Sequence, residues 1–142
     1  MTTQQIIDEL NEMTISNSEE YEQLERISEL VTLLKQNPDG QLSCEALINL
    51  LERHPNIEFG TPGQPIHTIE KYEGYYEGLL LKSLDRKPTF MTIWMLNRII
   101  NVEKGEQKAK LVEKMKSYTT HPLADEEAKN SALYFYEYQI IS

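Results

Sequence analysis

Apolar residues recur along most of this chain at steps of three and four positions, which is the period of an α-helix. The clearest stripe lies between residues 19 and 36 and consists of Tyr21, Leu24, Ile27, Val31 and Leu34. No segment shows the two-residue alternation that is typical of a half-buried strand. The pattern therefore predicts an all-α fold.

Turn residues divide this pattern into about seven helices. We predict them at residues 4–13, 19–36, 44–53, 66–84, 88–101, 106–118 and 123–141. Since most connections are short, we expect antiparallel hairpins that pair the second helix with the third, the fourth with the fifth and the sixth with the seventh, while the first covers an end. A HEAT-like or irregular helical array fits these helix lengths, although no sequence motif repeats. A compact bundle is the alternative.

The predicted fourth helix, residues 66–84, contains two glycines, Gly74 and Gly78. Each costs about 1 kcal/mol against alanine inside a helix. Because they are four positions apart, they would share one face, where a neighbouring helix could approach closely. We therefore expect close packing or a binding surface there.

Length and composition indicate a globular protein. The chain has 142 residues, of which 39% are hydrophobic and 26% charged, so we expect one helical domain over residues 1–142. No apolar run approaches the roughly 20 residues of a membrane span, and the first residues lack the basic and apolar blocks of a secretion signal. The single cysteine, Cys44, excludes an internal disulfide and a cysteine-rich metal framework. These features predict a cytoplasmic protein with no membrane partner, in which Cys44 is a small, partly buried residue of the core.

Charge is distributed unevenly along the chain. The net charge is −9, and residues 1–30 contain eight acids against the single base Arg26. Phosphates would be repelled by such a surface, so we expect no nucleic-acid partner. A basic protein would be attracted to it by electrostatic steering. The alternative is a solvated helix face that serves only solubility.

Motifs of catalysis and of cofactor or metal binding are missing from the sequence. It contains no phosphate-binding glycine loop, and neither HExxH nor CxxC, so we expect no enzyme, cofactor or metal. His54 and His121 each precede a proline at a predicted helix end, where a cap or dipole contact explains them. His67, near the irregular stretch 55–65, is the histidine with the best claim to another role.

Three carboxylates of the predicted fourth helix, Glu70, Glu73 and Glu77, would lie on one face. Such a cluster suits metal or acid-base chemistry, whereas a solvated face is the plainer interpretation. Tyr75 on the same helix is a candidate anchor for a partner if it is exposed, because tyrosine offers a large contact area and a hydroxyl.

The fifth helix is the most apolar and must be central, yet it carries Asn97, Arg98 and Asn101 within one turn. Buried polar groups are usually satisfied locally. We therefore expect Arg98 to pair with a carboxylate of the fourth helix, and the two asparagines to bond loop backbone, for instance at residues 60–65.

The segment from Gly63 to Asn101 resembles small helical immunity proteins that are encoded beside bacterial polymorphic or contact-dependent toxins. The residues that carry the resemblance are Gly63, Pro65, Ile66, Ile69, Glu70, Tyr72 and Tyr76, then Ser83, Leu84, Arg86, Pro88 and Thr89, and finally the run from Trp94 to Asn101. The resemblance implies a non-enzymatic inhibitor that binds a cognate toxin protein tightly. An acidic inhibitor would fit a basic nuclease toxin.

Our leading hypothesis is therefore an immunity protein whose binding surface is formed by the first two helices or by the irregular stretch. A general helical adaptor is the alternative, and an enzyme that uses the carboxylates of the fourth helix with a histidine is a third possibility. The candidate partner-binding residues are Glu19, Glu20, Glu22, Glu70, Glu73, Tyr75 and Glu77.

Overall fold

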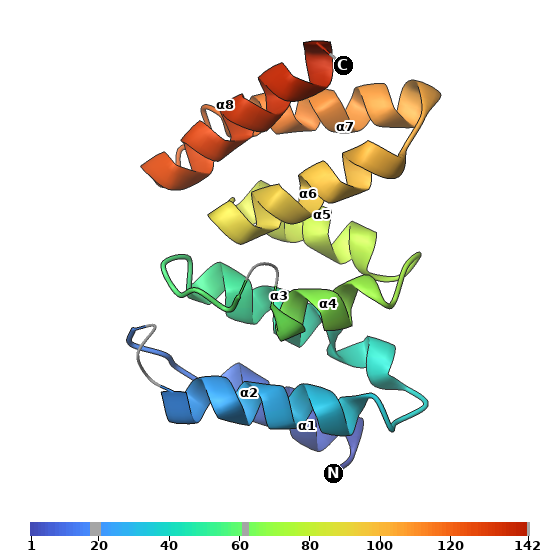
Figure 1. Ribbon diagram of the computed structural model, residues 1–142, viewed down its shortest axis with the longest axis vertical. Helices are drawn as coiled ribbons and strands as arrows, with labels where there is room; N and C mark the ends of the chain where they lie inside the picture. Colours follow the sequence, from blue (N-terminus) through green and yellow to red (C-terminus); the bar gives the residue numbers. More distant parts are fainter. Residues whose placement is uncertain (18–20, 61–62, 142) are drawn as a thin grey trace. The chain divides into compact units, whose positions relative to one another are not determined.

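The computed structural model describes residues 1–17, 21–60 and 63–141. Within these ranges the chain forms eight α-helices and one 3₁₀ turn, and no strand (Figure 1), which confirms the predicted all-α fold. The helices are α1 (Thr3–Glu12), α2 (Tyr21–Leu34), α3 (Cys44–Arg53), α4 (Gln64–Glu70), α5 (Tyr76–Arg86), α6 (Phe90–Val102), α7 (Gly105–Tyr118) and α8 (Glu126–Ile141), and the 3₁₀ turn is η1 (Gly40–Ser43).

The chain divides into two compact units, which we call unit 1 (Met1–Leu79) and unit 2 (Leu80–Ser142). The boundary falls inside α5. The expectation of one domain over residues 1–142 stays a prediction.

Unit 1 consists of two helical hairpins, α1 with α2 and α3 with α4. Between the two hairpins, α1 packs on α3 and α2 packs on α4, so that two layers result (Figure 1). The predicted pairing of the second helix with the third is wrong, because α2 packs mainly on α1 and α4. Apolar side chains fill the space between the layers: Ile6, Leu10, Ile27, Leu30, Leu47, Leu51, Ile66 and Ile69.

Unit 2 is built around the hairpin of α7 and α8, and α6 packs against both of these helices (Figure 1). The predicted pairing of the last two helices is therefore confirmed. Buried side chains from all three helices form the core, among them Ile93, Leu96, Ile100, Leu111, Met115, Ala128 and Ala132.

The predicted fourth helix is wrong, because a turn at residues 71–75 divides it into α4 and α5. Gly74 has a φ of +89°, in the left-handed region that favours glycine. The Glu77 carboxylate accepts the Gly74 N–H at 2.9 and 3.0 Å and so caps the start of α5. The expected close approach of a neighbouring helix is also wrong: apart from adjacent residues and the backbone of the same helix, no described atom lies within 4 Å of a Cβ built on Gly74 or Gly78.

Side-chain caps set the starts of two helices later than we predicted. Thr89 is the N-cap of α6: its hydroxyl accepts the Thr92 N–H at 3.3 Å, and its own N–H donates to the Thr92 hydroxyl at 3.0 Å. Pro88 therefore lies before the helix rather than in its first turn. In the last helix the Asp125 carboxylate accepts the Ala128 N–H at 2.8 Å, so α8 begins at Glu126 and not at residue 123.

Candidate functional site

The two units differ strongly in charge. Residues 1–79 contain fifteen acids against four bases, a net charge of −11, whereas residues 80–142 contain eight acids against ten bases, a net charge of +2. The negative charge of the whole chain therefore resides in unit 1.

Each of the first two helices of unit 1 carries three carboxylates: those of α1 are Asp8, Glu9 and Glu12, and those of α2 are Glu22, Glu25 and Glu29. Glu22, Glu25 and Glu29 are exposed and follow one another at steps of three and four residues, so they share one side of the helix. We call these three residues the acidic face. The predicted residues Glu19 and Glu20 directly precede α2 but lie outside the described residues.

Arg26 is the basic residue nearest to the acidic face in sequence, and its charge is already neutralised. Its guanidinium donates to Glu9 of α1 at 2.8 Å and to Glu29 at 2.9 Å. The hydrogen bond from Arg26 holds the pKa of Glu9 below its usual range. Within the described ranges no basic side chain pairs with Glu22 or Glu25, so both carboxylates remain open to a partner.

Glu70, Glu73 and Glu77 do not form the shared face that a continuous helix would have given them. Glu70 ends α4, Glu73 is exposed in the turn, and Glu77 caps Gly74. In the described part of the chain no three His, Cys, Asp or Glu residues are arranged to hold a metal ion. The acid-base or metal cluster is therefore not assembled. Tyr75 in the same turn is 44% exposed, as an anchor for a partner requires.

The histidines at helix ends have structural contacts, as we predicted. His54 is buried at the end of α3, where Nε2 accepts the Ile15 N–H at 3.0 Å and Nδ1 therefore donates to the Leu50 carbonyl at 2.8 Å. His121 accepts the Leu123 N–H at Nδ1, 3.1 Å away, and donates from Nε2 to the Asp85 carbonyl, 2.9 Å away. His67 is exposed on α4.

The two asparagines of α6, Asn97 and Asn101, face α8 and not a loop. Gln139 of α8 donates from Nε2 to Oδ1 of Asn97 at 2.8 Å and to Oδ1 of Asn101 at 2.7 Å. The expectation that loop backbone binds these asparagines is wrong, since an amide 42 residues further along the chain binds Asn97. The exposed Arg98 lies over the ring of Trp94, with its guanidinium carbon 5.4 Å from the ring centroid.

A second polar contact in unit 2 links α5 to α7. The buried Tyr118 donates its hydroxyl to Oδ1 of Asp85 at 2.8 Å, and Lys114 approaches the same oxygen at 3.3 Å. Burial, together with the hydrogen bond to Asp85, raises the pKa of Tyr118. This cluster supports the packing of unit 2 and offers no open site.

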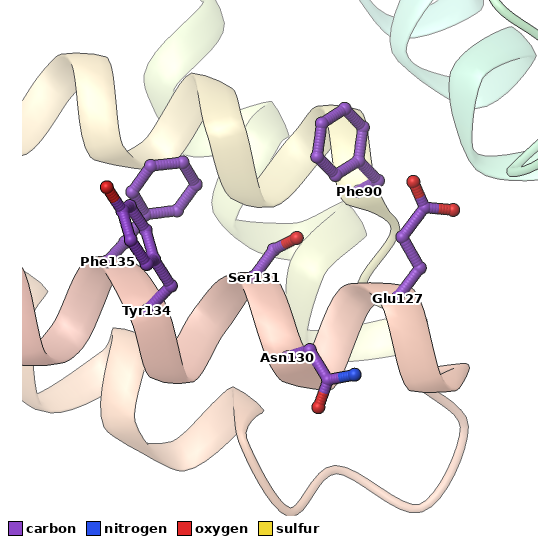
Figure 2. Close-up of a pocket in the computed structure, with 6 residues that line it drawn as sticks. All are labelled: Phe90, Glu127, Asn130, Ser131, Tyr134 and Phe135. Carbon is purple, nitrogen blue, oxygen red and sulfur yellow. The ribbon is translucent and has the colours of Figure 1, made fainter.

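Unit 2 also contains a hollow of about 690 Å³ that our reading of the sequence missed. We call it the α8 hollow, and its lining residues are Phe90 of α6 and Glu127, Asn130, Ser131, Tyr134 and Phe135 of α8. Figure 2 shows the side chains of Glu127, Ser131, Tyr134 and Phe135 on the side of α8 that faces α6, and the ring of Phe90 opposite them. The hollow depends on the juxtaposition of α6 and α8, which periodicity does not reveal.

No protein-family model, curated protein or solved structure matches this chain. None of the helices in the described ranges is long and apolar enough to cross a bilayer. Function must therefore be inferred from the acidic face, Tyr75 and the α8 hollow.

Proposed function

We propose that this chain is an immunity protein that acts in the bacterial cytoplasm and neutralises a cognate toxin without catalysis. The observation that carries the proposal is the charge of unit 1, −11, together with the open carboxylates of Glu22 and Glu25. The resemblance of the segment from Gly63 to Asn101 to small helical immunity proteins points the same way.

The chemistry of the acidic face favours a basic partner. A toxin that cleaves nucleic acid needs basic residues to bind phosphates, and an acidic protein surface is complementary to such a site. Attraction between the two surfaces increases the association rate, which benefits an inhibitor that must reach its target before the toxin reaches nucleic acid. Tyr75 is exposed in the turn between α4 and α5 and is available to a partner as an anchor of its own.

A helical adaptor is the second candidate, and the surface of α8 favours it. Leu133, Tyr134, Tyr138 and Ile140 are all exposed, at 47 to 67%. Such apolar surface is typical of proteins that bind other proteins. The two candidates differ in the partner: the partner of an immunity protein stops growth when it is released, whereas the partner of an adaptor does not.

The first experiment tests neutralisation. The chain is co-expressed with the protein encoded by the neighbouring gene, and growth is measured with and without it. We expect that the neighbouring protein stops growth alone and that this chain restores it, through a complex of about nanomolar affinity that weakens with salt. Growth that the neighbouring protein does not impair, or impaired growth that this chain does not restore, contradicts the proposal.

The second experiment tests the acidic face in that complex. Glu22→Gln combined with Glu25→Gln is compared with a control of equal charge change in unit 2, Glu106→Gln combined with Glu113→Gln, because all four residues are exposed. We expect the first pair to slow association about tenfold at low salt and the control to change it less than about twofold. Equal slowing by both pairs would show that only net charge matters and would remove the face from the proposal.

A further inference from the structure

Unit 2 places a cation over an aromatic ring at two positions. The Arg98 guanidinium lies 5.4 Å from the centroid of the Trp94 ring, and Lys116 Nζ lies 5.8 Å from that of Tyr136. Both distances are within the range of a cation–π contact. Cations of this chain therefore cover rings on α6 and on one side of α8.

The aromatic rings of the α8 hollow, unlike those of Trp94 and Tyr136, are not covered by a cation of the described chain. Phe90, Tyr134 and Phe135 line it, and the last two are packed edge to face, with centroids 5.5 Å apart. In the described ranges no Lys or Arg lies over any of these three rings. The hollow thus presents ring faces and edges to solvent with no cation of its own.

Glu127 adds a negative charge to the same hollow. Glu127 is exposed and is the single charged residue of the lining. Among the described residues, none pairs with its carboxylate or forms a hydrogen bond to it. In Figure 2 the carboxylate of Glu127 lies at the end of the hollow where Phe90 lies, on the same side of α8 as Tyr134 and Phe135, whose rings lie at the other end. An open carboxylate at the same end of a hollow as an aromatic ring attracts a cation that also has an apolar or planar surface.

We infer that the α8 hollow binds an arginine side chain of a protein partner. The planar guanidinium stacks on aromatic rings and forms two parallel hydrogen bonds with a carboxylate, whereas the compact, strongly hydrated ammonium of lysine does neither as well. Because Glu127 and Phe90 lie at one end of the hollow and Tyr134 and Phe135 at the other, the guanidinium lies between Glu127 and Phe90, and apolar neighbours of the arginine contact the rings of Tyr134 and Phe135. The inference concerns unit 2 alone and does not depend on the proposed function of the acidic face.

The probe is a short synthetic peptide with a central arginine between leucines, and its matched control has citrulline, which is isosteric and uncharged, in place of arginine. Binding is followed by the chemical shifts of backbone amides in the ¹⁵N-labelled chain. We expect the arginine peptide to shift the amides of Ser131 and Phe135 at about millimolar concentration, and the citrulline peptide to bind about tenfold more weakly.

Two variants test the role of the carboxylate. Glu127→Gln removes the charge from the hollow, whereas Glu126→Gln removes the same charge from the neighbouring exposed residue, which does not line it. We expect about tenfold weaker binding for Glu127→Gln and unchanged binding for Glu126→Gln, with equal thermal midpoints.

Three results would overturn the inference. They are equal binding of the arginine and citrulline peptides, equal effects of the two variants, and shifts confined to the acidic face of α2. The last result would show that the arginine responds to the charge of unit 1 and not to the hollow.

Discussion

Gln139 and Asn97 are joined by a hydrogen bond of 2.8 Å between side chains that are only 7% and 8% exposed. Replacing Gln139 by leucine keeps a side chain of similar size but leaves Oδ1 of Asn97 without this donor. We expect the free energy of unfolding to fall by about 1–3 kcal/mol, which is the cost of an unsatisfied buried polar group. Urea denaturation measures it.

The matched control for this bond is Asn101→Ala, which removes the second acceptor of Gln139 at an exposed position. Water can replace that partner, so we expect a loss of at most about 1 kcal/mol. If both variants lowered the free energy of unfolding equally, burial would not increase the contribution of the hydrogen bond to Asn97.

Gly63 cannot be replaced without strain. Its φ is +89°, and a Cβ at this position would lie 1.9 Å from the carbonyl oxygen of Phe59. We expect Gly63→Ala to lower the free energy of unfolding by at least about 1–3 kcal/mol. Gly78→Ala is the control: no described atom outside the adjacent residues and the backbone of α5 lies within 4 Å of its Cβ, so alanine should stabilise α5 by up to about 1 kcal/mol. A neutral Gly63→Ala would show that the start of α4 adapts.

Cys44 should resist alkylation while the protein is folded. Burial, with a smaller contribution from the charge of Glu77, raises the pKa of this thiol to about 12. Because the thiolate is the reactive form, iodoacetamide at pH 8 should label Cys44 only after denaturation. Ala109→Cys places a thiol at an exposed position of α7 and should be labelled at once in the native protein. Mass spectrometry distinguishes the two sites, and prompt labelling of native Cys44 would contradict the prediction.

Tyr118 should make the protein sensitive to alkali. Its pKa in the folded protein lies above the ordinary value of about 10, chiefly through burial and then through its bond to Asp85. The folded state therefore favours the neutral phenol, so the stability from this group is complete below pH 10 and is lost as pH rises from there toward the higher folded pKa. We expect unfolding free energies to drop more between pH 8 and pH 11 in the native protein than in Tyr118→Phe.

The control for that experiment is Tyr134→Phe, at an exposed tyrosine of α8. This variant should retain the full drop of the native protein. The same drop in both phenylalanine variants would assign the alkaline loss to other groups.

The helical period predicted most of the helices, but it missed the turn at residues 71–75. Ile69, Tyr72, Tyr76 and Leu80 continue the helical spacing through that turn, so the apolar pattern hides it. The signal was Gly74 with Glu77 three residues later, the pair that ends one helix and caps the next. We had interpreted Gly74 instead as a position inside a helix that allows close packing or forms a binding surface.

The partners of the polar residues were beyond the reach of local pattern. Asn97 was recognisable as a buried polar residue of an apolar helix, but its partner Gln139 lies on a helix that packs there only in the folded chain. The α8 hollow depends on the same packing, because Phe90 belongs to α6 and the other lining residues to α8. By contrast, the core position of Cys44 and the contact of His54 with its own helix at Leu50 were predicted correctly. The second contact of His54, with Ile15, again depends on packing in the folded chain.

His54 gives unit 1 a non-covalent cross-link. A chain with one cysteine has no disulfide to shorten its loops, yet the imidazole ties Ile15 to the end of α3 across 39 positions of sequence. Closing a segment of that length on folding is costly in chain entropy. A disulfide would lower that cost, because it already restricts the unfolded chain. The imidazole link exists only in the folded state, so it forms when the hairpins pack together, and no redox chemistry is needed to release it.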